Sequence, residues 1–239
     1  MENTTLSIFV PCFNEEKNIT TALNNIREAI ESINYEILVV NDGSKDKTAD
    51  MTEKFKKDNP NLNIKIFHNE KNVGLGSIYY STAFKASGKY YMLVNGDAVE
   101  PPSEIKKIVK NLGKADMILP NLINRRKDIR KIISRLFVII VNLITFNNLK
   151  YYNGQALHLV ENVKLYGRNA PGFGYQAELI TNLLLHKKTY LEVAIECAQR
   201  SHGTSTAFSP RNILGVTNTI INIFLNQIIY FIKKILKMK

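Results

Sequence analysis

Short apolar runs alternate with helical patterns along the first half of the chain. The runs are rich in β-branched and aromatic residues, which is typical of buried strands, and they cover residues 6–10, 35–40, 63–67, 90–94 and 115–119. Between the first two runs, Ile19, Leu23 and Ile26 recur at helical spacing. Strands that alternate with helices predict an α/β fold, in which helices cover both faces of a mostly parallel sheet.

Two apolar segments with basic ends follow in the second half. Residues 129–146 begin with basic side chains and continue into an apolar body. Residues 212–239 are apolar, but four amides interrupt them, namely Asn218, Asn222, Asn226 and Gln227. Neither segment contains about 18 uninterrupted apolar residues, as a spanning helix would. Helices of the protein core would show the same pattern, but apolar helices with basic ends are typical of segments that lie in a membrane interface.

The charge distribution separates the two halves of the chain. Residues 1–120 hold 15 Lys or Arg and 16 Asp or Glu, whereas residues 121–239 hold 17 and 5, so the whole excess of the net charge of +11 lies in the second half. Such asymmetry indicates an anionic partner, either a membrane or a nucleic acid. Because the basic residues accompany apolar helices rather than an aromatic-studded groove, we expect a membrane surface and no nucleic acid. The only two cysteines, Cys12 and Cys197, are far apart, which fits a reducing compartment.

Polar side chains follow three of the predicted strands at the point where each strand ends. These loops are residues 11–15, 41–44 and 95–97. Asn95 and Asp97 provide two oxygen-bearing side chains, which suit a hard cation, although Asn-Gly-Asp is also ordinary turn chemistry. In open α/β sheets, ligands bind beyond the carboxyl ends of the strands. Three polar loops at one edge therefore favour a ligand site over plain turns.

Read together, the motifs resemble the family 2 glycosyltransferases of GT-A fold. The closest likeness is to the polyprenyl-phosphate sugar transferases of the dolichyl-phosphate mannose synthase type. The similarity covers residues 6 to about 206, and the motifs that carry it are VPCFNEE (10–16), VVNDGSKDKT (39–48), the run 72–104 and RSHGTS (200–205). The resemblance implies a transferase domain over residues 1–206, in which 125–149 form a membrane-interface helix. Residues 207–239 would form a C-terminal membrane-associating segment.

The resemblance implies a nucleoside-diphosphate sugar as the donor. It places Pro11, Phe13 and Glu15 beside the base and ribose of the nucleotide. In the same comparison, Asp42 accepts a hydrogen bond from the base. An acidic acceptor that faces a ring N–H has the right polarity for uracil or guanine. A plain turn that opens a helix is the alternative reading of Asp42 and its neighbours.

The resemblance also implies a divalent cation, Mg²⁺ or Mn²⁺, on the diphosphate. Asn95-Gly96-Asp97 aligns with the Asp-x-Asp motif that holds this ion in the family. Asn95 replaces a carboxylate, and Val99 replaces a glutamine that some members use as a further ligand. An amide carbonyl still offers an oxygen, and water and phosphate can complete the shell of the ion. We therefore expect weak metal affinity, or a cation role that arginines share.

Two acceptor chemistries remain open. Glu178 is the candidate base if the acceptor is a sugar hydroxyl, although a glutamate in the first turn of a helix is an equal alternative. A prenyl phosphate needs cations instead, because its oxygen is already anionic. By resemblance, Arg130 in the membrane-facing helix and Arg200 and Ser205 in the following loop would bind such phosphates.

Together with the charge and the apolar segments, the resemblance implies an inverting glycosyltransferase at the cytoplasmic face of a membrane, with a polyprenyl phosphate as the acceptor. Transfer to a hydroxyl of a surface glycan or glycolipid is the nearest alternative. A non-catalytic subunit of the same fold is a third, suggested by Asn95 and Val99. A homo-oligomer is compatible with each of them.

Overall fold

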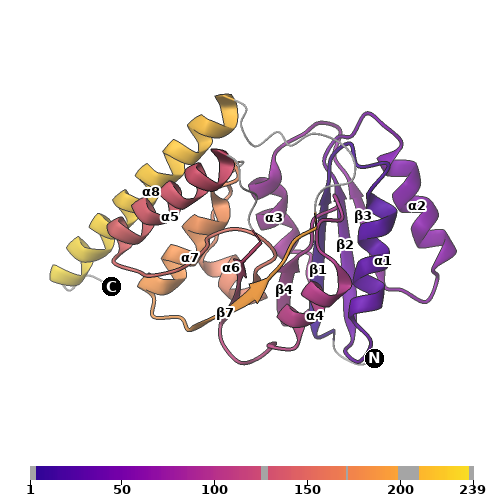
Figure 1. Ribbon diagram of the computed structural model, residues 1–239, viewed down its shortest axis with the longest axis horizontal. Coiled ribbons are helices and arrows are strands. Elements are labelled where there is room, and N and C mark those ends of the chain that lie inside the picture. Colours follow the sequence, from indigo (N-terminus) through magenta and orange to yellow (C-terminus); the bar gives the residue numbers. More distant parts are fainter. Residues whose placement is uncertain (1–3, 125–128, 171, 199–209, 237–239) are drawn as a thin grey trace.

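The computed structural model describes residues 4–124, 129–170, 172–198 and 210–236. A seven-stranded sheet lies at its centre, with the strand order β3-β2-β1-β4-β6-β5-β7 (Figure 1). The strands are β1 (Leu6–Cys12), β2 (Tyr35–Asn41), β3 (Ile64–His68), β4 (Tyr90–Leu93), β5 (Met117–Leu122), β6 (Leu157–Leu159) and β7 (Tyr190–Ile195). Only β6 runs antiparallel to its neighbours, so the expected mostly parallel α/β sheet is confirmed.

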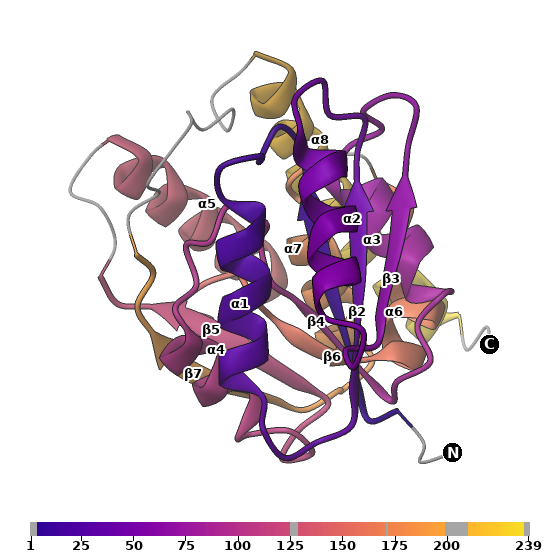
Figure 2. The ribbon, with the colours of Figure 1, turned by 90° about the vertical axis from the view of Figure 1, so that its right-hand side faces the viewer.

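Helices cover both faces of this sheet (Figure 2). Their bounds are α1 (Ile19–Ala29), α2 (Thr48–Asp58), α3 (Leu75–Ala83), α4 (Pro102–Val109), α5 (Ile129–Thr145), α6 (Val160–Tyr166), α7 (Tyr175–Leu185) and α8 (Pro210–Ile235). Strand residues alternate between the two faces, so that Ile8 packs with α1 and α4, and Phe9 packs with α3 and α7. The sheet therefore separates two apolar cores.

The five predicted strands all occur, each within three residues of its predicted bounds. The strands β6 and β7 were not predicted. In β6 only three residues pair, and β7 is half-exposed along most of its length, so neither shows a clear apolar run.

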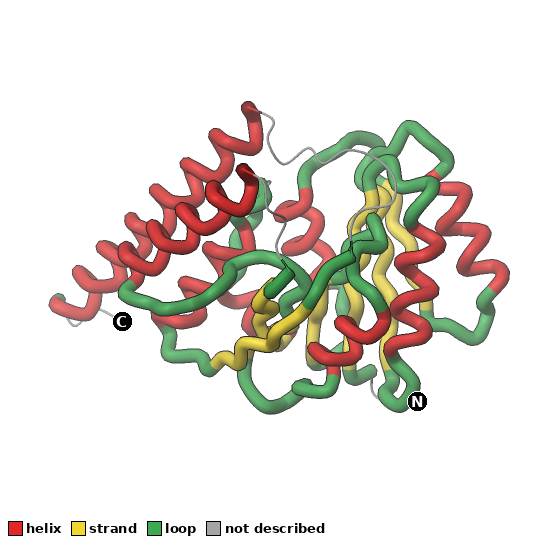
Figure 3. The backbone as a smooth tube through the Cα atoms, viewed as in Figure 1, coloured by secondary structure: helices red, strands yellow, loops and turns green. Residues whose placement is uncertain are grey.

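Helices α5 and α8 lie side by side on the flank of the molecule that is farthest from α1 and α2 (Figure 3). Both helices present apolar side chains outward. The exposed residues are Ile132, Ile133, Leu136, Ile139 and Leu143 of α5, and Ile221, Phe224, Leu225, Ile228, Ile229, Ile232 and Ile235 of α8. We call this set the apolar face. Burial of such side chains in a hydrocarbon environment is favourable, so a face of this size indicates an interaction surface.

Candidate functional site

The carboxyl edge of the sheet brings the three polar loops together, as the sequence predicts. Strand β1 lies between β2 and β4, so the loop that follows it contacts both neighbouring loops. The backbone N–H of Gly96 donates to the carbonyl of Pro11 at 3.1 Å. The N–H of Asn14 donates to the hydroxyl of Ser44 at 2.9 Å, and that of Glu15 donates to Thr48 at 2.8 Å. These cross-links give the edge a fixed backbone geometry.

Asp42 lies at the end of β2 and is almost fully buried. Its Oδ1 accepts hydrogen bonds from Nδ2 of Asn69 at 2.8 Å and from the N–H of Val73 at 3.1 Å. Its Oδ2 accepts one from the N–H of Gly74 at 3.0 Å. The carboxylate therefore anchors the loop that leads into α3. Its contact with a nucleotide base remains a prediction, and such a contact would have to share an oxygen that already binds the loop.

The residues expected to flank the nucleotide differ in exposure. The ring of Phe13 is 41% exposed, which leaves it available for stacking on a base. Glu15 is buried, and its Oε2 accepts a hydrogen bond from Nδ2 of Asn18 at 2.7 Å. Because its carbonyl also accepts the N–H of Ile19, Glu15 fixes the start of α1. Of these residues, Phe13 has the side chain best placed to meet a ligand.

The candidate metal loop contains a partner that the sequence did not reveal. The Asn95 amide donates from Nδ2 to Oε1 of Glu100 at 2.6 Å, and the Asn95 N–H donates to Oε2 at 3.3 Å. Glu100 is only 2% exposed. Burial and the nearby charge of Asp97 raise the pKa of Glu100 to about 8. The pair therefore orients Asn95 and adds a second carboxyl group to the loop.

This donor set fits a divalent cation held by few protein ligands. With Nδ2 turned towards Glu100, the carbonyl oxygen of the Asn95 amide is left for another partner, and Asp97 adds a carboxylate to the same loop. The described part of the chain has no group of three or more His, Cys, Asp or Glu side chains that could hold a metal. Mg²⁺ and Mn²⁺ accept water and phosphate oxygens as remaining ligands, so Asn95 and Asp97 are the residues that would hold an ion that arrives with a diphosphate.

Two glycines allow close contacts between α3, the segment before α7, and α8. A Cβ on Gly76 in α3 would collide with the carbonyl oxygen of Ala170, and a Cβ on Gly174 would collide with Thr219 of α8. Because neither glycine has a side chain, the segment around Gly172 lies directly between α3 and α8. The loop that Asp42 anchors leads into α3, and α3 in turn contacts the segment that precedes α7.

Glu178 lies in the first turn of α7 and is 5% exposed. Its Oε1 accepts a hydrogen bond from Nδ2 of Asn222 in α8 at 3.3 Å, and Thr219 also donates to it. Burial raises the pKa of Glu178 above its usual range, while these two donors and the charge of Arg168 offset part of the rise. A carboxyl with a raised pKa is suited to proton transfer near neutral pH.

The residues expected to bind a lipid phosphate are only partly placed. Arg130 lies in the first turn of α5, but its side chain is outside the described residues. Arg200 and Ser205 are also outside them. The chain that leads to Arg200 is fixed at Ala198, whose N–H donates to the carbonyl of Val99 at 2.8 Å. This segment therefore leaves β7 beside the candidate metal loop.

The sequence profile described as Glycosyl transferase family 2 matches residues 7–171. The chain belongs to this family. The match includes every strand of the sheet except β7, together with the three polar loops.

Two curated relatives are named as dolichol- or dolichyl-phosphate sugar transferases. The chain is 30% identical over 105 residues to a dolichol-phosphate mannosyltransferase of Pyrococcus furiosus, which covers 44% of this chain and 29% of the relative. It is 27% identical over 173 residues to a dolichyl-phosphate beta-glucosyltransferase of Dictyostelium discoideum, which covers 63% and 52%. The matches thus span about half or less of the length of these relatives.

The fold also matches solved structures. A glucosyl-3-phosphoglycerate synthase from Mycobacterium tuberculosis, in complex with Mn²⁺, uridine diphosphate and glucosyl-3-phosphoglycerate, aligns with a TM-score of 0.70. The alignment covers 93% of this chain and 79% of that chain at 18% identity. This likeness confirms the GT-A fold expected for the family 2 domain.

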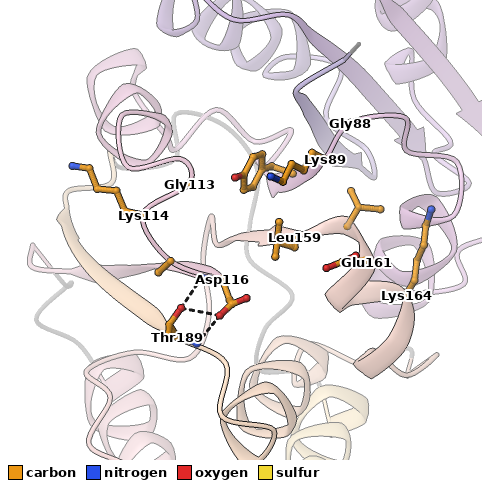
Figure 4. Close-up of a pocket in the computed structure, with 12 residues that line it drawn as sticks. Gly88, Lys89, Gly113, Lys114, Asp116, Leu159, Glu161, Lys164 and Thr189 are labelled. Carbon is orange, nitrogen blue, oxygen red and sulfur yellow. Dashed lines mark hydrogen bonds between the residues drawn. The ribbon is translucent and has the colours of Figure 1, made fainter.

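A separate pocket of about 650 Å³ opens at the opposite, amino edge of the sheet in this family 2 protein (Figure 4). At one side of it, the N–H and the hydroxyl of Thr189 donate hydrogen bonds of 2.8 and 2.7 Å to Asp116. Its three lysines, Lys89, Lys114 and Lys164, lie on different sides of the opening and do not converge. None of the predicted site residues lines this pocket, so it is not the candidate active site.

Proposed function

We propose that this family 2 transferase moves a sugar from a nucleoside-diphosphate sugar to a polyprenyl phosphate at the cytoplasmic face of a membrane. The observation that carries the proposal is the apolar face of α5 and α8, which adjoins the segment leading into α7. A lipid acceptor must reach the site from a bilayer, and α8, which carries part of this face, also contacts Glu178, the candidate residue for the acceptor. The two dolichyl- and dolichol-phosphate relatives support the same acceptor class.

Helix α8 has two properties that bear on how it meets a membrane. By length and composition, Leu214–Ile235 could cross a bilayer, with a mean hydropathy of 1.3. However, one side of the helix carries Thr219, Asn222 and Gln227, and this side packs against the protein. A helix with one face on protein and one apolar face outward fits a position in the membrane interface.

The chain's own residues would divide the reaction as follows. Phe13 and Asp42 would hold the base of the donor, and Asn95 and Asp97 would hold the divalent ion. That ion, when bound, neutralises charge on the departing diphosphate. Attack by an acceptor oxygen on the face opposite the diphosphate inverts the sugar carbon. Arg130 and Arg200 would hold the acceptor phosphate bidentately.

One observation favours a second candidate, transfer to a hydroxyl of a glycan or glycolipid. Glu178 is buried, has a raised pKa and is held by two donors from α8. A hydroxyl acceptor needs a base of this kind, whereas a phosphate oxygen is already ionised.

The two candidates separate in one assay. Protein in membranes or detergent would be incubated with a panel of uridine- and guanosine-diphosphate sugars, Mg²⁺ or Mn²⁺, and either prenyl phosphate or a lipid-linked glycan. We expect a prenyl phosphate product with an inverted anomeric linkage, identified by NMR. Transfer only to the glycan would contradict the phosphate acceptor and support the hydroxyl acceptor.

A Glu178→Gln variant provides the matched comparison. It should reduce transfer to phosphate modestly and transfer to a hydroxyl by about 10²–10⁴-fold.

A further inference from the structure

The pattern of side chains in the middle of α8 is the reverse of that on an ordinary surface helix. From Ile221 to Ile232 its exposed side is apolar, whereas its inward side carries polar residues at helical spacing around Ile223. Thr219, Ile223 and Gln227 are at most 6% exposed, and Asn222 and Asn226 are half-buried on the same side. The amides that interrupt the apolar sequence therefore mostly face the protein. Buried polar side chains need hydrogen-bond partners, so this stripe requires a specific polar surface opposite it.

The partner surface is the start of α7. Thr219 occupies the space left by the missing side chain of Gly174, and the backbones of Gly172 and Gly215 approach closely. This contact brings the Thr219 hydroxyl and the Asn222 amide onto one carboxylate, that of Glu178, with the Asn222 hydrogen bond at 3.3 Å. Asn226 lies one turn further along α8. Among the described residues, the side-chain donors to Glu178 are Asn222 and Thr219 and do not include Asn226.

We propose that Thr219 and Asn222 are positioning residues, which hold the Glu178 carboxyl group so that the helix bearing the apolar face also completes the acceptor side of the site. The inference rests on the proposed glycosyl transfer for the role of Glu178, but not for the contact itself. Among the described residues, Arg168 is the charged group that lowers the pKa of Glu178, and it lies in the segment before α7. The donors on α8 are neutral, so α8 acts through direction and hydrogen bonding rather than through charge.

A hydrogen bond to the ionised form of a carboxyl group favours that form. Removal of either donor should therefore move the ionisation of Glu178 to higher pH. The titration can be followed by NMR of ¹³C-labelled glutamate side chains in the full-length, detergent-solubilised protein. The Glu178 signal is assigned by its loss in Glu178→Gln.

Four variants make the test specific. Asn222→Ala and the nearly isosteric Thr219→Val should each move the titration midpoint of Glu178 upward. Thr219→Ser keeps the hydroxyl and should restore the wild-type midpoint, and Asn226→Ala on the same face should leave it unchanged. With a hydroxyl acceptor, the turnover of Asn222→Ala on the acid side of the pH profile should fall by about 10- to 100-fold, as expected for a lost hydrogen bond to a charged group.

The outcomes distinguish this inference from the proposed function. Identical midpoints in wild type, Asn222→Ala and Thr219→Val would overturn the positioning role. Shifted midpoints without transfer to either acceptor would support the positioning contact and contradict the proposed function. If Asn222→Ala disturbs the fold, as judged by circular dichroism, Thr219→Val and Thr219→Ser still decide the question.

Discussion

Asn95 places a neutral amide where the Asp-x-Asp motif has its first carboxylate, and the buried carboxyl group of Glu100 holds this amide. The two side chains are joined at 2.6 Å, and Glu100 is buried with a pKa of about 8. Because burial and the charge of Asp97 raise the pKa of Glu100, Asp97 should make the larger contribution to binding a cation and a diphosphate.

Replacement of this carboxylate gives the first prediction. Asp97→Ala should lower kcat by roughly 10²–10³-fold, the usual effect of removing one group that stabilises charge in the transition state. The measurement is sugar transfer at saturating Mn²⁺. Asp58→Ala, on the exposed surface of α2, is the control and should behave as wild type. Near-normal turnover of Asp97→Ala would contradict the site.

The second prediction concerns the pair. Asn95→Asp alone should destabilise the protein, because it removes the amide donor and adds a negative charge beside the buried Glu100 and the charge of Asp97. Asn95→Asp combined with Glu100→Gln restores a donor and a carboxylate with their positions exchanged. The double variant should unfold at a temperature close to that of wild type and bind Mn²⁺ more tightly in calorimetry. A double variant no more stable than Asn95→Asp would refute the pairing.

The sequence predicted that Asn95 and Asp97 lie at the carboxyl edge of the sheet, but it could not reveal Glu100 as their neighbour. Ala98 adopts a positive φ of 58°, and this turn brings Glu100, five positions after Asn95, to face Asn95. A positive φ is uncommon for residues other than glycine, and alanine at this position gives no reason to predict it from the sequence. The carboxyl edge itself was predictable, because it follows from the order of the strands alone.

At the scale of the elements, α8 is the least conventional part of the molecule. Its apolar sequence suggests membrane contact, and its amides look like interruptions until their spacing is compared with the packing. The fold shows that three of the four amides lie on the side that packs against the protein, together with Ile223, whereas Asn218 and most of the apolar residues are exposed. Which side faced the protein could not be inferred from the sequence, because a core helix would place the apolar side inward.

The third prediction tests the apolar face. Phe224 is half-exposed on α8, and a buried aromatic side chain contributes about 1.5–3 kcal/mol. Phe224→Asp should therefore weaken binding to anionic lipid vesicles by about 10- to 100-fold, measured by flotation. Binding of the wild-type protein should survive high salt, because burial of hydrocarbon is not screened.

Thr21→Asp adds the same charge on an exposed position of α1, across the sheet from α8, and should bind vesicles like wild type. Equal loss of binding in both variants, or complete release of the wild type by salt, would indicate an electrostatic attachment instead.

For the whole molecule, the two cores meet at a sheet that contains one buried histidine. His158 in β6 is fully buried, and neither ring nitrogen has a hydrogen-bond partner among the described residues. Burial lowers the pKa of His158 to about 3, so the folded protein keeps the ring neutral. An unfolded chain would bind a proton at its ordinary pKa of about 6.5.

The fourth prediction follows from this difference. Stability from the neutral ring is fully present above about pH 6.5 and is lost as the pH falls towards 3. Between pH 7 and pH 5 the loss should be on the order of 2 kcal/mol, measured by denaturant unfolding. His158→Met should remove this dependence, whereas the exposed His186→Asn should retain it. The same slope in His158→Met as in wild type would assign acid sensitivity to other groups.

The contact between α8 and α7 also has a consequence in time. The first residues of α5 and α8 are 81 positions apart, which a ribosome translates in about 4 to 16 seconds. During that interval α5 has its apolar side chains available, and Glu178, once it is translated, has no partner from α8. If the apolar face binds a membrane as proposed, a growing chain would reach lipid first through α5. The contact between Glu178 and α8 would then form only afterwards, on a chain that is already anchored.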